Sequence, residues 1–360
     1  MSLIPATILT GFLGSGKTTL LKRVLQEQHG FKIAIIENEF GEENIDNEIL
    51  VSDVKEQIIQ MSNGCVCCTI REDLRTTLKD LAEKKRKGEL DFDRIVIETT
   101  GIADPGPVAQ TFFMDEEIAE QFLLDSVLTL VDAKHAAGQL NDRQEARKQV
   151  GFADQIFLSK TDLVSEGEVD ALIHRLKHMN PRAPIKAVHF GEVAIKDVFD
   201  LRGFNLNAKL DIDPDFLKDD AHDDHGHGHA EHAHHDHKEG EHCDHPSHAH
   251  GHEGHGHHHH IDDDVKSFVF RSERAFDPAK LEDFLGAIVN IYGPRMLRYK
   301  GVLNMVGTER KVIFQGVHQL MGSDLGPQWA ENEQKTNKMV FIGIDLPKDI
   351  FLQGLEQCLA

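Results

Sequence analysis

The sequence predicts an α/β protein with a mostly parallel sheet, followed by a linker and a small α+β domain. Three observations support this prediction. Short apolar segments alternate with amphipathic ones over residues 1–210, a histidine-rich acidic stretch occupies residues 211–264, and a second alternating pattern fills residues 265–360. Strands that alternate with helices are typical of a parallel sheet covered on both faces. The middle stretch has no apolar pattern around which to fold, so we expect it to be disordered.

Most candidate strands of the first domain are rich in Val, Ile or Leu, as strands buried on both faces should be. They are Ala6–Thr10, Lys32–Ile36, Gln57–Met61, Arg94–Glu98, Ser126–Val131, Gln155–Ser159 and Ile185–Phe190. The C-terminal domain is expected to hold a mostly antiparallel sheet. Its predicted elements are strands at Lys266–Phe270, Leu297–Met305, Lys311–Met321 and Lys338–Ile344, with helices at Pro278–Tyr292 and from Pro347.

Composition limits the class of protein. The 360 residues are 40% hydrophobic, enough for two domains with proper cores. The apolar opening lacks a charged leader and is expected to be the first strand, not a signal peptide. No apolar run is long enough to span a membrane. Five cysteines, an odd number, favour a reducing compartment, and we expect the cytoplasm. Of the net charge of −22, residues 211–264 contribute −14, so nucleic acid is not an expected partner.

A phosphate-binding motif follows the first predicted strand. Residues 11–18, GFLGSGKT, match G-x-x-x-x-G-K-[ST] and lead into an amphipathic helix, the context that supports a P-loop NTPase domain. Lys17 is expected to bridge the terminal phosphates, and the Thr18 hydroxyl to bind Mg²⁺. Backbone N–H groups at the helix start should cradle the phosphates. The residues expected to line this cradle are Gly11, Gly14, Ser15, Gly16, Lys17, Thr18 and Thr19.

Two further strand ends carry candidate nucleotide-binding residues. Glu98 ends the strand RIVIE and suits the magnesium side, while Gly101 can offer its N–H to the γ-phosphate; Lys17 and Glu98 are the candidate catalytic residues. After the strand QIFLS, Lys160 and Asp162 resemble a guanine-reading motif, in which Asp accepts from two guanine nitrogens. Ser159 stands where Asn is usual. GTP is therefore preferred over ATP. No glutamine or arginine is identifiable as an aid to hydrolysis, so the intrinsic rate should be low.

Three cysteines crowd into the stretch GCVCC. Cys65, Cys67 and Cys68 precede a predicted helix that opens with the capping box Thr69-x-x-Glu72. A helix N-terminus favours thiolate, and closely spaced thiolates select Zn²⁺, Cu⁺ or related metals. A redox relay and buried small side chains are the alternatives, and we weigh both below metal binding.

Acidic residues and histidines extend the candidate metal chemistry. Glu37 and Glu39, after the second strand, are candidate additional ligands near the cysteines. Residues 222–260 hold 18 of the 24 histidines, mostly neutral imidazoles at pH 7 and good zinc ligands. We take this tract as a metal depot that selects poorly between metals. Its representative candidate ligands are His225, His227, His229, His257 and His258.

Taken together, these motifs resemble those of the CobW-like metallochaperone GTPases, relatives of the GTPases that deliver nickel to urease and hydrogenase. The resemblance covers nearly the whole chain and rests on GFLGSGKTTLL, IENEFGE, GCVCC, IETTGIADP, SKTD, the histidine-rich insert and LRYKGVL. It implies GTP hydrolysis coupled to insertion of a metal, most often zinc, into a client metalloprotein. It also implies the roles already given to Lys17, Thr18, Glu98, Lys160, Asp162 and the three clustered cysteines. Co²⁺ and Ni²⁺ stay open as alternative metals.

Two other functions compete with this interpretation. One is a metal buffer whose histidine tract stores metal while the nucleotide regulates release. The other is a small-molecule kinase, although no acceptor pocket or lid is recognisable in the sequence. The sequence names neither the client nor the oligomeric state, and a homodimer is among the assemblies to be tested.

Overall fold

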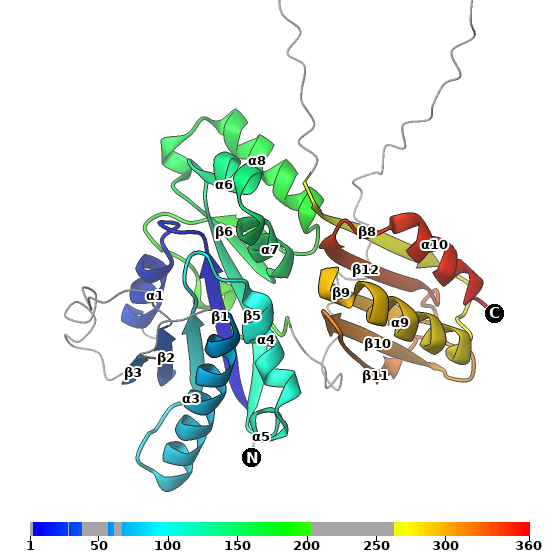
Figure 1. Ribbon diagram of the computed structural model, residues 1–360, viewed down its shortest axis with the longest axis horizontal. Coiled ribbons are helices and arrows are strands. Elements are labelled where there is room, and N and C mark those ends of the chain that lie inside the picture. The colour runs from blue at the N-terminus through cyan, green and yellow to red at the C-terminus, as the bar shows by residue number, and fades with distance from the viewer. Residues whose placement is uncertain (1–2, 28, 38–56, 61–66, 204–262) are drawn as a thin grey trace, which may run out of the picture.

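A computed structural model describes residues 3–27, 29–37, 57–60, 67–203 and 263–360, without the side chains of 57–60 and 67–72. Two sheets organise these residues, each with its own helices, and the two domains lie side by side (Figure 1). The predicted fold class, an α/β domain with a parallel sheet followed by an antiparallel C-terminal domain, is confirmed.

The first domain is built on a seven-stranded sheet in the order β3-β2-β4-β1-β5-β6-β7, and every pair is parallel. Its strands are β1 (Ile4–Gly11), β2 (Ile33–Glu37), β3 (Gln57–Gln60), β4 (Arg94–Glu98), β5 (Phe122–Asp132), β6 (Gln155–Ser159) and β7 (Ile185–Ala187). Two bounds differ from prediction by more than two residues. β5 begins four residues early because Phe122–Leu124 pairs with the start of β1. β7 ends at Ala187, and Phe190 beyond it has φ +46°.

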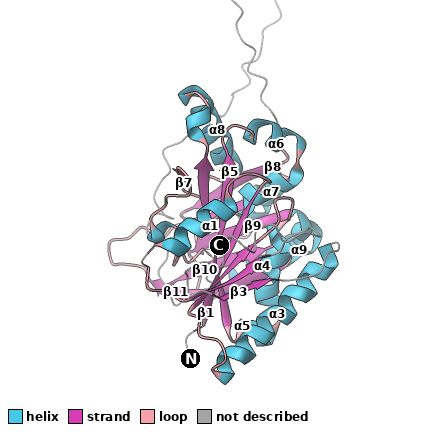
Figure 2. Ribbon diagram, turned by 90° about the vertical axis from the view of Figure 1, so that its left-hand side faces the viewer, coloured by secondary structure: helices cyan, strands magenta, loops and turns pink. Residues whose placement is uncertain are grey.

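Helices cover both faces of this sheet (Figure 2). They are α1 (Lys17–Gln26), α3 (Cys67–Lys87), α4 (Pro105–Met114), α5 (Glu116–Ala119), α6 (Ala136–Asp142), α7 (Gln144–Phe152) and α8 (Glu166–Met179), with short 3₁₀ turns η1 (Thr161–Leu163) and η2 (Ile195–Asp197). Leu20 and Val24 of α1 pack on one face, with Leu9 and Val96 of the sheet. Helices α3, α4, α7 and α8 pack on the other face. The apolar side chains of β1, β2, β4, β5 and β6 therefore contribute to two separate cores.

Helix α3 begins earlier than the sequence predicted. Thr69 was expected to cap it, but the helix already includes Cys67. Thr69 is thus inside the first turn and is not the cap. Further along the helix, Leu74, Leu78 and Leu81 form a fully buried apolar stripe. The helix consequently starts at the cysteine motif itself.

The C-terminal domain has a five-stranded antiparallel sheet in the order β11-β10-β9-β12-β8. Its elements are β8 (Val265–Ser272), α9 (Pro278–Tyr292), η3 (Gly293–Arg295), β9 (Met296–Leu303), β10 (Arg310–Val317), β11 (Leu320–Gln328), β12 (Asn337–Ile344) and α10 (Lys348–Gln357). The single strand expected over Lys311–Met321 is in fact the hairpin β10–β11. It turns at His318, whose φ of +52° cannot continue a strand.

The two faces of the C-terminal sheet belong to different cores. One face, with Phe268 and Phe341, packs on its own helices α9 and α10. The other face, with Leu297 and Val317, joins the core of the first domain around Phe152. Asp263 and Asp264 are also fixed, although we expected them in the linker: each forms an ion pair with an arginine of the first domain. The rest of that stretch, residues 204–262, lies outside the described residues.

Candidate functional site

The carboxyl edge of the parallel sheet carries the predicted nucleotide site, beginning with the loop between β1 and α1. Gly16 precedes the helix with φ +100°, a conformation that favours glycine, and the helix begins at Lys17. The Lys17 ammonium folds back and donates to the Gly11 carbonyl oxygen at 2.9 Å. Burial lowers the pKa of Lys17, and the nearby Glu98 carboxylate opposes that shift. A phosphate would supply the anionic partner that this buried ammonium lacks in the loop.

Glu98 ends β4, next to β1 in the sheet, and accepts a hydrogen bond from the Thr18 hydroxyl at 3.0 Å. The pair brings a hydroxyl and a carboxylate together, 80 residues apart in sequence. Both are hard oxygen ligands of the kind that Mg²⁺ selects. The residues at this point therefore fit a magnesium ion.

The chain after β4 packs directly on the phosphate loop. A Cβ on Gly101 would lie 2.5 Å from the Leu13 backbone nitrogen, so only glycine fits. The buried Gln149 of α7 fixes this turn, because its side-chain amide donates to the carbonyl oxygens of Gly101 at 3.2 Å and Ala103 at 3.0 Å. Sequence analysis missed Gln149, since its role depends on a helix nearly 50 residues further along the chain.

Two buried hydroxyls at this edge have no hydrogen-bond partner within the described part of the chain. They are Ser15 Oγ in the phosphate loop and Thr100 Oγ1 beside Gly101. Buried polar groups are normally satisfied, so an unpartnered pair marks a place where a polar ligand or water completes the structure. Both hydroxyls belong to the segments predicted to surround the phosphates.

The predicted base-reading residues follow β6. Ser159 donates from its hydroxyl to the Ser15 carbonyl oxygen at 2.7 Å, and Lys160 donates to the Gly14 carbonyl oxygen at 2.8 Å. Both therefore tie the end of β6 to the phosphate loop. At the position where Asn is usual, Ser159 therefore makes this link with its hydroxyl. Asp162 lies in η1 with its carboxylate half exposed.

Asp132 at the end of β5 is a site residue that sequence analysis missed. Its buried carboxylate accepts from the Lys160 ammonium at 2.6 Å and contacts His135 Nδ1 at 2.9 Å. Burial alone would raise the pKa of Asp132, but the hydrogen bonds from Lys160 and His135 outweigh it and hold the pKa below its usual value. Asp132 therefore positions Lys160. An acid at the end of an apolar strand, as with Glu98, was the available signal.

Only some of the predicted metal-ligand residues lie in the described part of the chain. Glu37 ends β2 in register with Glu98 of β4, and Cys67 and Cys68 open α3. No group of three or more His, Cys, Asp or Glu side chains that could hold a metal occurs in the described part of the chain. The predicted ligands outside the described residues are Cys65, Glu39, His225, His227, His229, His257 and His258.

Comparison with known proteins agrees with this geometry. Residues 5–187 match the family described as CobW/HypB/UreG, nucleotide-binding domain, and residues 265–359 match the cobalamin synthesis protein cobW C-terminal domain. The chain belongs to the CobW/HypB/UreG family. Like the members of that family, it is a P-loop GTPase.

Several relatives of this CobW/HypB/UreG protein match along almost its whole length. The zinc chaperone YjiA of Escherichia coli is 38% identical over 350 residues, covering 97% of this chain and 96% of YjiA. The zinc chaperone CobW of Sinorhizobium is 29% identical and covers 95% of this chain and 93% of that protein. The crystal structure of Zn(II)-bound YjiA superposes with a TM-score of 0.73 at 34% identity, covering all of both chains.

Across the described residues, no helix is both long enough and apolar enough to cross a membrane.

Proposed function

We propose that this GTPase is a metallochaperone that binds zinc at Cys65, Cys67 and Cys68 and transfers it to a client metalloprotein. Three thiolates leave one tetrahedral position open, as a transfer site requires. The names of the relatives support the choice of metal, because YjiA and CobW are both called zinc chaperones. We further propose that the exchange takes place in the cytoplasm, where thiols stay reduced.

One row of the parallel sheet carries the proposal. Gln60, Glu37 and Glu98 are consecutive partners on β3, β2 and β4. Glu98 also holds Thr18. The chain leaves this row at Gln60 and reaches Cys67, the start of α3, seven residues later. Only a few residues therefore separate this row from the start of α3 at Cys67, and we propose that a change at the γ-phosphate reaches the metal ligands by this short route.

The nucleotide residues have distinct roles in this proposal. Lys17 exchanges its contact with the Gly11 carbonyl for phosphate oxygens, and the Gly101 N–H senses the γ-phosphate. Thr18 and Glu98 hold Mg²⁺, which neutralises phosphate charge when bound. Asp162 reads the guanine edge. Glu98 accepts a hydrogen bond from Thr18 and is the strand partner of Glu37. In this proposal it is therefore the residue through which GTP hydrolysis affects the metal ligands.

The histidine tract at residues 222–260 is proposed to be a depot. Its 18 imidazoles bind many ions weakly and raise the local metal concentration near the cysteines. The described structure on either side of it is firmly held: the Gly203 carbonyl oxygen accepts from Lys300 at 2.5 Å, and Asp263 pairs with Arg175 at 2.6 Å. Both flanks of residues 204–262 are therefore anchored to the described domains.

A zinc titration with and without GTP and Mg²⁺ tests the proposal. The wild type is expected to bind about one tight equivalent of zinc, with an affinity that depends on the nucleotide. Cys67→Ala should abolish that equivalent, because each thiolate is one of very few strong bonds. Cys358→Ala is the matched control: it removes a buried thiol in the C-terminal domain and should change neither quantity.

Deletion of residues 222–260 should remove only weakly bound metal and leave GTP turnover intact. If the deletion instead eliminated the tight equivalent and Cys67→Ala did not, the roles would be reversed. The protein would then be a metal buffer, and the chaperone proposal would be withdrawn.

A further inference from the structure

Phe190 combines two features that stability alone does not explain. Its side chain is 77% exposed, more than any other large hydrophobic side chain in the described residues. Its φ of +46° is in the left-handed region, which is an outlier for a bulky residue. Strained backbone of this kind persists only where its surroundings impose it, and it clusters at functional sites. The contacts of the neighbouring residues show what imposes it here.

The loop around Phe190 is fastened on both sides. Val188 donates its backbone N–H to the Leu158 carbonyl oxygen of β6 at 2.8 Å. Gly191 lies against α1, so closely that a Cβ there would be 2.9 Å from the Thr19 carbonyl oxygen. Glu192 pairs with Arg23 of the same helix at 3.2 Å. The loop therefore presents Phe190 at a fixed place between the end of β6 and the helix that follows the phosphate loop.

That place adjoins the base-reading residue. His189 Nδ1 lies 3.8 Å from Asp162 Oδ1. The Phe190 ring contacts the His189 ring edge-on, with centroids 4.5 Å apart. Asp162, His189 and Phe190 thus form a continuous surface. A carboxylate suited to the edge of a purine lies within one residue of an exposed aromatic face.

We propose that Phe190 is the aromatic platform of the nucleotide site, on which the guanine base stacks while Asp162 reads its edge. This inference rests on the proposed binding of guanine at Asp162. Stacking of a base on an aromatic ring changes affinity by about ten- to a hundredfold. It also accounts for the exposure and the strain together, because a ring that binds the base must lie open in the free protein.

A platform contributes differently from a carboxylate that reads the base edge. Every purine has a π-face, so stacking strengthens GDP, GTP and xanthine nucleotides alike. Asp162, in contrast, discriminates between them. Loss of the platform should raise the Michaelis constant for GTP and leave the turnover number nearly unchanged, because the ring contacts the base and is remote from the phosphates.

Equilibrium binding of GDP with Mg²⁺ tests this assignment. Phe190→Ala should weaken GDP and xanthosine diphosphate by the same factor of about ten or more. Phe190→Trp should restore affinity and show quenched fluorescence on binding. Phe190→Leu, apolar without a π-face, should bind like the Ala variant. Ile350→Ala removes an exposed side chain on α10 and is the control, with GDP affinity unchanged.

Thermal unfolding separates a binding role from a structural one. Phe190→Gly relieves the positive φ and removes little buried surface, so its melting temperature should be at or above that of the wild type while GDP affinity falls. A lower melting temperature with unchanged affinity would make Phe190 a structural residue and overturn the proposal. Equal GDP affinities for Phe190→Leu and Phe190→Trp would also overturn the proposal, because the ring would then act only as an apolar cover.

The outcome for Asp162→Asn keeps the two proposals distinguishable. If this variant shifts preference from guanine to xanthine but Phe190→Ala binds normally, guanine recognition stands and the platform fails. If the wild type shows no preference for guanine nucleotides, the proposed base site itself fails.

Discussion

The nucleotide edge and the domain interface both bury charged side chains, but they do so in different ways. At the nucleotide edge, formed by the loops after β1, β4 and β6, the hydroxyls of Ser15 and Thr100 have no partner within the described part of the chain. There the Lys17 ammonium donates to the Gly11 carbonyl oxygen. At the domain interface, where α7 meets β8 and β9, buried arginines and acids are paired with each other. Buried polar groups at the first region thus await a ligand, whereas the buried charges of the second region are paired within the protein.

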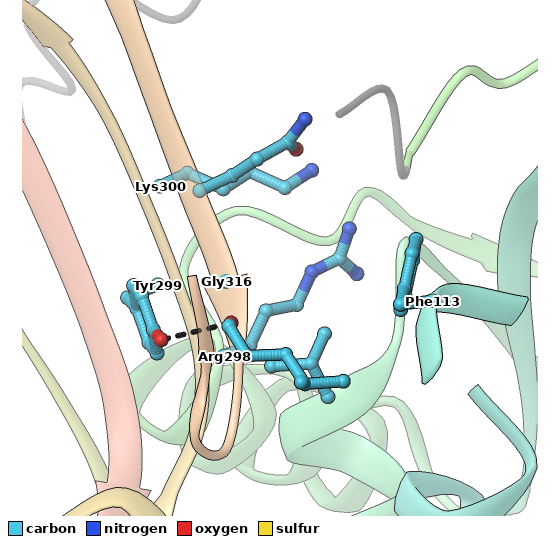
Figure 3. Close-up of a pocket in the computed structure, with 8 residues that line it drawn as sticks. Phe113, Arg298, Tyr299, Lys300 and Gly316 are labelled. Atoms are coloured by element: carbon cyan, nitrogen blue, oxygen red, sulfur yellow. Dashed lines mark hydrogen bonds between the residues drawn. The ribbon is translucent and has the colours of Figure 1, made fainter. Parts of the chain in front are cut away.

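Arg298 is the centre of the domain interface. It comes from β9, is 4% exposed, and reaches Asp154 at 2.5 Å and the Phe152 carbonyl oxygen at 3.0 Å, both in the first domain. Figure 3 shows it pointing from the C-terminal domain towards Phe113 of α4, across a cavity of about 10 Å³, roughly the space of one water molecule. Arg147 similarly pairs with Asp264 at 2.5 Å. Such pairing of buried charges indicates a permanent interface.

Helix α7 connects the two regions. Gln149 holds Gly101 at the nucleotide edge, while Arg147 and Phe152 on the same helix contact the C-terminal domain. The C-terminal domain is therefore part of the scaffold that positions the turn after β4.

The largest expected effect comes from breaking the interface. Arg298→Met leaves the buried Asp154 without its main partner and should lower the free energy of unfolding by about 3–5 kcal/mol. Urea denaturation measures this loss. GDP affinity of the folded fraction should change less than threefold, since no nucleotide contact is removed. A large loss of GDP affinity without a loss of stability would contradict the division into two regions.

Lys300→Met is the matched control for this prediction. Lys300 lies two residues along the same strand and approaches the same Asp154 carboxylate, at 3.5 Å. Burial lowers the pKa of Lys300 to about 8, so its charge is already disfavoured. Its removal breaks the hydrogen bond to the Gly203 carbonyl oxygen but leaves Asp154 paired with Arg298, so it should cost about 1–2 kcal/mol, less than Arg298→Met. Equal losses for the two variants would show that Arg298 has no special role.

A substitution at the nucleotide edge should have an intermediate effect, and it should lower GTP turnover and not stability. Gly101→Ala pushes a methyl group against the Leu13 backbone, which cannot yield cheaply. Displacement of the phosphate loop by a fraction of an ångström should lower GTP turnover about a hundredfold. Steady-state kinetics measure the loss. Gly138→Ala, in α6 with open space around it, should leave turnover unchanged.

The smallest effect concerns pH at the domain interface. The His318 ring packs against the Phe152 ring, with centroids 5.4 Å apart. Burial lowers the pKa of His318; the Asp104 carboxylate opposes this shift and the Lys148 ammonium adds to it. The unfolded chain therefore takes up a proton first as the pH falls below about 6.5, and stability declines. The wild type should lose more unfolding free energy between pH 7 and pH 5.5 than His318→Asn does, by about 1 kcal/mol or less. An unchanged slope would show that His318 does not titrate at the interface.

Local patterns made much of the nucleotide edge predictable. The phosphate loop, Glu98 and Lys160 each follow an apolar strand, and parallel strands bring their carboxyl ends to one edge. Asp132 and Gln149 escaped prediction because each acts on a partner distant in sequence, Lys160 and Gly101 respectively. Phe190 escaped because the apolar pattern predicts the end of a strand there, and only its φ of +46° shows that the chain turns.

The sequence by itself determined both folds, since the period of apolar residues and the turn chemistry are local properties of the chain. It also determined the phosphate loop, whose glycines and lysine are contiguous. Only the tertiary structure decided that the second sheet shares a core with the first domain, that Arg298 of β9 pairs with Asp154, and that His189, the neighbour of Phe190, lies beside Asp162. Those contacts join residues up to about 140 positions apart. Their formation depends on shape and charge complementarity between finished elements, which no local pattern encodes.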